Sequence, residues 1–217
     1  MILLEKLKSI FSKRNLPINT KQEPAFNKNK VFDDTLFYYR NVNIKKLLAN
    51  SILNKYPVGS YPVDEWIDFC AKSNNLNPKI ILTVLEKNLQ LVTRTDFIPV
   101  YKLQGAMGVG VLPGGLVAPA YANFSMQVKV AAENYRRWFD TFAVGRKVNC
   151  IDDDSVIPEN AFTYALYMCD PYVGTNDLYR VTTIKDEDGN VSPEKKLQYE
   201  APFGVYATWK IWRTLPI

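Results

Sequence analysis

The stretch "NPKIILTVLEKNLQLV", residues 77–92, has the most regular apolar spacing in the chain and decides the fold class. Asn77 suits an N-cap and Pro78 the first helical position, so the spacing predicts a helix that begins there. Successive residues of a helix advance by about 100°, which gathers the large apolar side chains on one broad face. That face comprises Ile80, Ile81, Val84, Leu85, Leu89, Leu91 and Val92. The expected polar side comprises Thr83, Lys87 and Gln90, with Glu86 at its edge.

Asn88 is the one polar residue near the centre of this apolar face, where it aligns with Ile81, Leu85 and Val92. A buried amide without hydrogen bonds costs roughly 1–3 kcal/mol. The position therefore needs a partner, either as a structural amide or as a member of a functional site. The residues alone leave both explanations open.

Composition bounds the class of protein and of chemistry. The chain has 217 residues, 47% of them apolar, which suits one globular domain, and a net charge of +5. That charge fits a cell wall, a nucleic acid or a membrane surface and selects none of them. The chain has no histidine, which excludes Ser-His-Asp and Cys-His catalysis and His-ligated zinc. Acid–base chemistry then needs a carboxylate, Tyr, Lys or Cys.

The remaining candidate motifs point to no cofactor and no metal. Three cysteines, an odd number without a C-x-x-C pair, favour reduced thiols. The loop "GAMGVG" lacks the Gly-Lys-Ser/Thr ending of a phosphate-binding loop, and "DDD" at 152–154 lacks the spacing of a calcium loop. We expect the acidic run to be a solvated loop or the start of a helix.

The N-terminal 30 residues differ from the rest of the chain. "MILLEKLKSIFSKR" predicts an amphipathic helix that lies on a membrane, docks on a partner protein or packs on its own domain. The basic, proline-containing residues 15–30 predict an extended arm. We therefore divide the chain into the helix and arm, 1–30, and a folded domain, 31–217. Neither a signal peptide nor a transmembrane segment is apparent, so we expect synthesis in the cytoplasm without export.

The remaining pattern predicts a mainly α domain. Helices are expected at 33–56, 62–75, 77–93, 123–143, 158–174 and 203–217. A glycine- and proline-rich loop occupies 105–120. A small β-hairpin is expected near 178–200, turning at Asp188-Gly189.

Five blocks of this sequence resemble, in the same order, a lysozyme-like, lytic-transglycosylase-related family of peptidoglycan hydrolases. The first block is the helix at 77–93, and together the blocks cover residues 75 to 212. The later ones are "LQGAMGVGV" (103–111), "YANFSMQVKVAAENYRRWF" (121–139), "VIPENAFTYALYMCDPYVGTN" (156–176) and "YATWKIW" (206–212). The resemblance implies an α+β lysozyme-like fold, in which a helical bundle surrounds a glycan-binding cleft.

The resemblance also implies where the catalytic acid would be. The glutamic acid of the family falls on Asn88, whose amide can neither give up nor take a proton, so that position is a degenerate acid position. Glu86 lies about 200° around the helix and is no easy substitute. Asp96, just after the helix, is the best substitute acid.

The substrate-binding residues that the resemblance implies lie in the later blocks. They are a cleft glutamine, two residues of the glycine turn and an aromatic wall: Gln127, Met107, Gly108, Tyr164, Tyr167 and Tyr172.

Three functions remain as hypotheses. The first is a lysozyme-like protein related to peptidoglycan hydrolases, catalytically impaired, that acts in structure or wall binding within a phage virion. Its partners would be peptidoglycan glycan strands and, through residues 1–30, other virion or assembly proteins. The second is an active muramidase or lytic transglycosylase that uses a displaced acid. The third, with the least support, is a nucleic-acid-binding domain that uses the basic arm and the aromatic helices.

Overall fold

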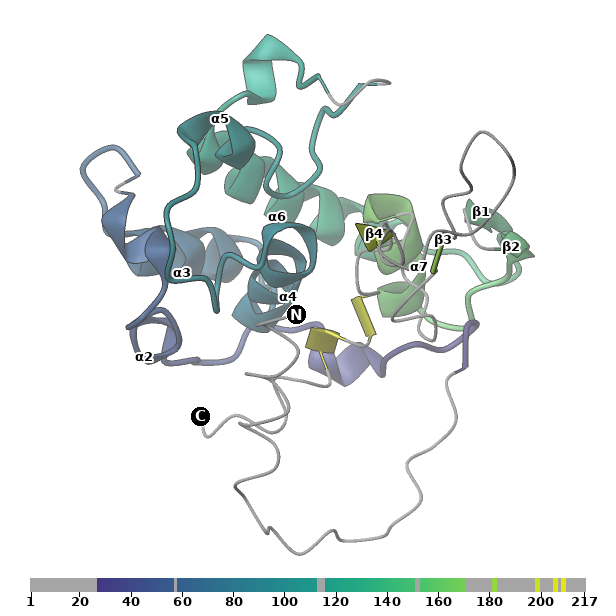
Figure 1. The fold of residues 1–217 in the computed structure, drawn as a ribbon. Coiled ribbons are helices and arrows are strands. Elements are labelled where there is room, and N and C mark those ends of the chain that lie inside the picture. The colour runs from purple at the N-terminus through teal and green to yellow at the C-terminus, as the bar shows by residue number, and fades with distance from the viewer. Residues whose placement is uncertain are drawn as a thin grey trace, which may run out of the picture.

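The computed structural model describes residues 27–170, except 57, 113–115, 151 and 152, together with 181–182, 198–199, 205–206 and 208–209. This part of the chain is mainly helical, as the sequence predicts (Figure 1). Its α-helices are α2 (Ile44–Leu47), α3 (Val63–Ser73), α4 (Pro78–Leu89), α5 (Val100–Leu103), α6 (Phe124–Asp140) and α7 (Ala161–Cys169). Short 3-10 turns occupy Asp34–Leu36, Ile52–Lys55 and Pro119–Tyr121.

Helix α4 begins where its capping residues predict. The Asn77 side chain accepts a hydrogen bond from the Lys79 amide at 3.1 Å, and Pro78 fills the first turn. The helix ends at Gln90, whose backbone is left-handed with φ 56°. The start follows from local sequence, whereas the helix ends earlier than the predicted residue 93.

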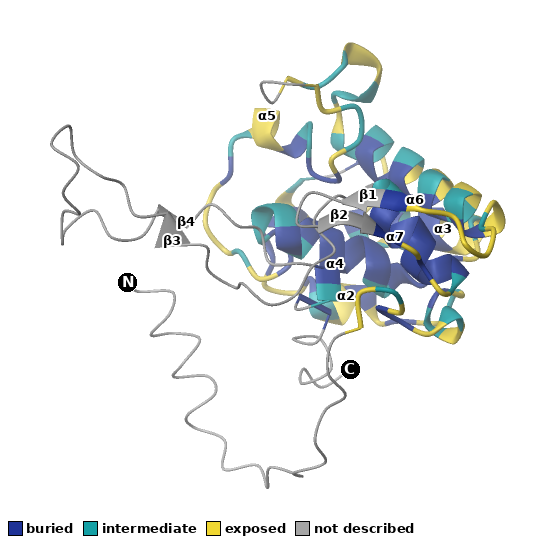
Figure 2. Cartoon of the chain, turned by 90° about the vertical axis from the view of Figure 1, so that its right-hand side faces the viewer, coloured by how far each residue is buried: buried dark blue, intermediate teal, exposed yellow. Residues whose placement is uncertain are grey.

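The burial of α4 extends to the polar side that the sequence predicts. No residue from Pro78 to Leu89 is exposed, and Thr83 and Lys87 are buried at 0% and 7% (Figure 2). The polar side chains are satisfied inside the protein instead. Thr83 donates to the Lys79 carbonyl at 2.6 Å, which is the ordinary bond of a threonine within a helix.

Lys87 is paired with Asp170, the residue that follows α7. Their closest nitrogen–oxygen distance is 2.8 Å, and the two side chains are only 3% and 5% exposed. Asp170 lies 83 residues further along the chain. The pair therefore fixes the back of α4 to the C-terminal end of α7.

The segment before α2 packs on α7 and α6 through aromatic rings and backbone contacts. The Phe37 ring stacks on Phe139 with 3.9 Å between centroids. The Asp34 carboxylate accepts from the Phe162 amide at 2.8 Å, and the Val31 amide donates to the Thr163 hydroxyl at 2.9 Å. Two ends of the described chain are thus joined in one core.

The described end of the predicted arm also contacts α7. The Lys28 carbonyl accepts from the Tyr167 hydroxyl at 3.1 Å, and the Asn29 carbonyl accepts from the Glu159 amide at 2.7 Å. Residues 1–26, which carry the predicted amphipathic helix, lie outside the described residues.

The helix predicted at 33–56 is wrong, because the chain there forms only α2 and two 3-10 turns. The Asn43 side chain accepts from the Lys46 amide, and the Ser51 side chain accepts from the Leu53 amide. Each of these two residues caps the start of a new short helical turn. Polar capping residues inside the apolar pattern therefore interrupt the predicted long helix.

Two short strand pairs complete the described fold. β1 (Val148–Cys150) pairs antiparallel with β2 (Asp153–Val156), where we expected a solvated loop or a helix start at 152–154. β3 (Val181–Thr182) pairs antiparallel with β4 (Gln198–Tyr199), with Val181 opposite Tyr199. The turn expected at Asp188-Gly189 lies outside the described residues.

The thiols of Cys70 and Cys169 are free. Burial is the main cause that raises the pKa of Cys70 to about 12, and burial also raises the pKa of Cys169. Both thiols are therefore protonated at neutral pH.

None of the helices in the described residues has the length and apolar character to cross a bilayer.

The buried ion pair yields a test of how α4 is held. Replacing Lys87 by Met leaves the Asp170 carboxylate in the core without this cation, and breaking a buried pair costs about 3–5 kcal/mol. We expect Lys87→Met to lower the free energy of unfolding by that amount in urea titrations. The double variant Lys87→Met/Asp170→Leu should recover most of the loss, because neither charge remains buried.

Lys129→Met is the matched control, since its partner Glu133 lies 3.9 Å away and both side chains are 49% exposed. An exposed pair of this kind contributes about 0–1 kcal/mol. Equal losses in Lys87→Met and Lys129→Met would show that the buried pair does not hold the core.

Candidate functional site

Asn88 lies near the C-terminal end of α4, and its side chain is partly exposed. The amide nitrogen donates a hydrogen bond to the Ala106 carbonyl at 3.0 Å. The amide oxygen accepts no bond from the described residues. Asn88 therefore ties α4 to the glycine-containing turn at 105–111 and keeps one acceptor for water or a ligand.

Gln127, on α6, holds the same turn from inside. Its side chain is fully buried at 0% exposure. The amide oxygen accepts from the Met107 and Val109 backbone amides, both at 3.1 Å. The amide nitrogen donates to the Val109 carbonyl at 2.8 Å and to the Tyr121 carbonyl at 2.9 Å.

These four bonds use both donors and both acceptor positions of a glutamine amide. The Gln127 amide, which the resemblance assigns to sugar binding, is therefore buried and bonded to the chain's own backbone. The resemblance singled out Gln127, but the sequence gave no signal that its partners are backbone groups, three of them 18 to 20 residues away and one six residues away.

The two turn residues singled out from the sequence have different surroundings. Met107 is buried at 5% exposure, so its side chain belongs to the core. Gly108 is exposed and has a left-handed backbone with φ 74°. Gly110 is also left-handed, at φ 67°, and the Tyr121 ring occupies the place where a Cβ would lie. A larger residue at position 110 would displace Tyr121 and open the turn.

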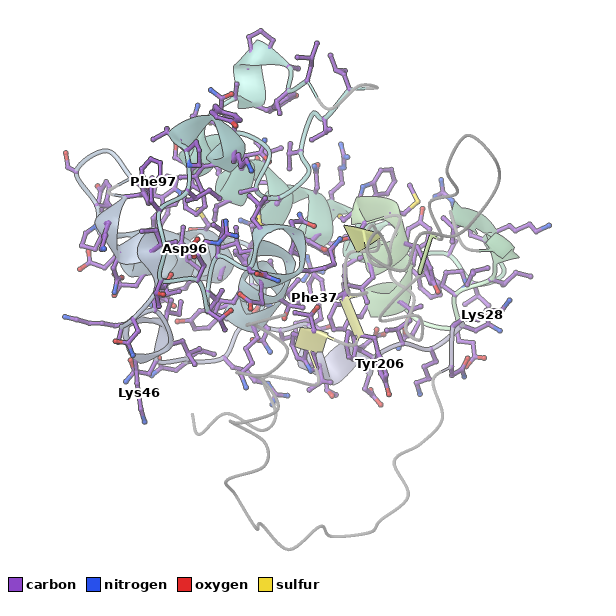
Figure 3. All side chains as sticks on the ribbon, viewed as in Figure 1. Lys28, Phe37, Lys46, Asp96, Phe97 and Tyr206 are labelled. Carbon is purple, nitrogen blue, oxygen red and sulfur yellow. The ribbon has the colours of Figure 1, made fainter. Side chains whose placement is uncertain are left out.

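The two carboxylates nearest to Asn88 in sequence are already engaged. Glu86 accepts from the backbone amides of Val92 at 2.9 Å and Thr93 at 3.0 Å, and it also binds the Thr93 hydroxyl. It therefore closes the loop that leaves α4. Asp96 is 76% exposed and pairs with Arg94 at 3.4 Å, next to Phe97 in Figure 3.

Tyr164 and Tyr167 do not form an exposed aromatic wall. Tyr164 is fully buried against Trp138 and Phe142, with ring centroids 6.2 and 5.8 Å away, and its hydroxyl has no hydrogen-bond partner among the described residues. Tyr167 is 7% exposed and donates to the carbonyl of Lys28, which Figure 3 shows far across the molecule from Asp96. These rings serve the packing of α7. Tyr172 lies outside the described residues.

A row of exposed aromatic rings on and before α3 was not expected from the sequence. Trp66 lies between Tyr61 and Phe69, with centroids 6.1 and 5.6 Å away, and the planes tilt by 38° and 27°. Tyr61 and Phe69 are 57% and 59% exposed. The Trp66 indole donates to the Ser125 carbonyl at 3.2 Å, which holds the row against the start of α6.

Neighbouring residues of α3 differ sharply in burial, although both lie in the helix predicted at 62–75. Cys70 faces the core at 2% exposure, whereas Phe69 faces solvent. The apolar pattern alone could not reveal this, because an aromatic residue next to a core position is equally compatible with burial. Across the described part of the chain, no group of three or more His, Cys, Asp or Glu is placed to hold a metal ion.

Comparison with known proteins gives no further assignment. The sequence matches no known family profile, and neither the curated proteins nor the solved structures contain a match.

The Gln127 contacts predict a large effect of a change that keeps the side-chain volume similar. Gln127→Leu removes the partner of four backbone groups, and each buried polar group left unpaired costs about 1–3 kcal/mol. Because the turn can partly open to water, we expect a loss of about 3 kcal/mol in the free energy of unfolding. Hydrogen exchange at the Met107 and Val109 amides should accelerate most.

Gln104→Leu is the control, since Gln104 is partly exposed and borders the same turn. It should leave both stability and exchange close to those of the unmodified protein. Slow exchange at Met107 and Val109 in Gln127→Leu would show that other contacts hold the turn.

Proposed function

We propose that this protein is a lysozyme-like domain that binds peptidoglycan glycan strands without cleaving them by the usual acid-catalysed route. The observation that carries the proposal is the amide of Asn88, bonded to the Ala106 carbonyl of the glycine turn. This is the position at which the resemblance to peptidoglycan hydrolases puts the proton donor.

Glycoside cleavage needs a carboxylic acid that protonates the leaving oxygen. An amide cannot perform that step. The two candidate replacements carry other interactions, since Glu86 binds the backbone after α4 and Asp96 is largely solvated beside Arg94. The arrangement therefore favours recognition of a glycan over its hydrolysis.

The row of Tyr61, Trp66 and Phe69 supports contact with a saccharide. Aromatic rings present flat apolar faces, which match the apolar face of a pyranose ring. Glu65 is exposed on the same helix and offers an acceptor for sugar hydroxyls. Stacked rings beside a polar acceptor are suited to a glycan chain, which is apolar on its ring faces and polar at its edges.

A muralytic assay on dye-labelled cell-wall sacculi tests the loss of the acid. We expect no release of soluble fragments by the unmodified protein or by Asn88→Gln. Asn88→Glu should gain measurable cleavage, because a neutral carboxyl can donate to the Ala106 carbonyl where a carboxylate would be repelled. That contact raises the pKa of the introduced acid and keeps it protonated near neutral pH.

Cleavage by the unmodified protein would overturn the non-catalytic proposal. Asp96→Ala would then identify the donor, since loss of cleavage in that variant assigns the role to Asp96. Thermal unfolding of each variant separates loss of activity from loss of fold.

Sedimentation with sacculi tests the aromatic row. We expect Tyr61→Ala/Phe69→Ala to weaken binding by about tenfold, in line with the loss of about two aromatic contacts. Phe97→Ala, which truncates a ring that is 73% exposed outside the row, should bind as the unmodified protein does. Equal binding by all three proteins would exclude the row as the glycan-binding surface.

A further inference from the structure

The described residues between Phe97 and Tyr121, which include α5, project from the helical core at the top of both views (Figures 1 and 2). We call its described residues, 97–112 and 116–121, the apolar lobe. Its large exposed side chains, with their exposed fractions, are Phe97 73%, Val100 62%, Tyr101 65%, Val111 45%, Leu112 50% and Leu116 72%. Solvated surfaces rarely gather so many large apolar side chains in one place.

The lobe is a built part of the fold. Ile98, Leu103 and Ala106 are buried beneath it at 0–3% exposure. Near Gly105, methyl groups of Val111 and Val117 lie 3.7 and 3.4 Å from the position that a Cβ would take, so the two arms of the lobe lie against each other. The exposed side chains are therefore carried on a fixed base.

Charge is almost absent from this region. From residue 97 to residue 128, the sequence contains a single charged side chain, Lys102, and the first carboxylate after Asp96 is Glu133. Lys102 is exposed on α5, between exposed Tyr101 and buried Leu103. A convex apolar surface with aromatic residues and one cation matches the boundary between headgroups and acyl chains of an anionic bilayer. A protein partner would instead have to enclose this projection in a pocket.

Several backbone groups of the lobe form hydrogen bonds within the protein, which suits a surrounding medium with little water. The Leu112 backbone amide donates to the Leu116 carbonyl at 2.7 Å, and the Ala118 backbone amide donates to the Gly110 carbonyl at 2.9 Å. The buried Gln127 amide satisfies further backbone groups of Met107, Val109 and Tyr121. Unpaired backbone groups are what make loops costly to place in lipid, and these internal bonds remove much of that cost.

We propose that the apolar lobe inserts into the interfacial layer of a lipid bilayer, with Lys102 against anionic headgroups. The contact is peripheral, and the lobe does not cross the bilayer. It rests on the exposed side chains, the charge distribution and the backbone pairing of the lobe, and it is independent of glycan binding.

Sedimentation with lipid vesicles tests this proposal on the full chain. Vesicles of phosphatidylcholine alone and of phosphatidylcholine with phosphatidylglycerol are the two probes. We expect binding to the anionic vesicles, and a decrease of about tenfold or more in Phe97→Ser/Leu116→Ser, because two exposed side chains lose their transfer into lipid. Lys102→Gln should weaken binding to the anionic vesicles and leave binding to the neutral ones unchanged.

Val144→Ser is the matched control, since Val144 is 88% exposed and lies outside the lobe, after α6. It should bind as the unmodified protein does. Val100→Ser/Tyr101→Ser provides a second lobe variant in case the first one folds poorly, with circular dichroism as the check. Because every variant retains residues 1–26, the comparison isolates the lobe from that segment.

Two results would overturn the proposal. One is vesicle binding that is equal in the unmodified protein and both lobe variants. The other is the absence of vesicle binding by the unmodified protein. A dimer in sedimentation velocity that Phe97→Ser/Leu116→Ser converts to a monomer would then assign the lobe to self-association.

Discussion

The structure depends on burying most of α4, although the helix carries polar residues on its back. A buried helix must satisfy each polar side chain within the protein, because water is not available to do so. Thr83 donates a hydrogen bond to a carbonyl of its own helix, and Lys87 forms an ion pair with Asp170 at the end of α7. The ion pair therefore requires that the last turn of α7 lie behind α4. The positions of α6 and of the segment before α2 follow, because both pack on α7.

A second constraint acts on the other side of α4. The turn at 105–111 contains left-handed glycines and little regular structure, so its backbone groups need partners from elsewhere. Gln127 provides three of these bonds and a fourth to the Tyr121 carbonyl, and Asn88 provides one more to Ala106. Two amides from two helices thus hold one irregular loop. The same two amides therefore hold the turn beside Asn88 and the base of the apolar lobe.

Local signals in the sequence were sufficient for the elements that begin with a capping residue and continue with regular apolar spacing. Asn77 with Pro78 identified the start of α4, and the helix predicted from residue 123 corresponds to α6, whose N-cap is Asn123. The same spacing failed at 33–56, where Asn43 and Ser51 cap new turns. It also failed to predict α5 and the β1–β2 pair, which are too short to show a period.

For the candidate site, the sequence identified the positions better than their roles. Asn88 was recognised as an amide that needs a partner, but the partner is a backbone carbonyl 18 residues away. Gln127 and Lys87 have partners that only the folded chain brings close, so the sequence placed Lys87 on the polar side of its helix and the resemblance placed Gln127 in a cleft. Side-chain direction on α3 was the remaining difficulty, since a small rotation decides whether Phe69 is in the core or in water.

The contacts of the segment before α2 have a consequence for biosynthesis. The Val31 amide and the Thr163 hydroxyl are 132 residues apart, and the Asp34 carboxylate and the Phe162 amide are 128 apart. A ribosome releases the early partner of each contact long before the late one exists. During that interval Phe32 and Phe37 have no α7 to pack against, and their rings are available to chaperones or to other nascent chains. Closure of the domain is then a late, non-local step, of the kind that slows folding.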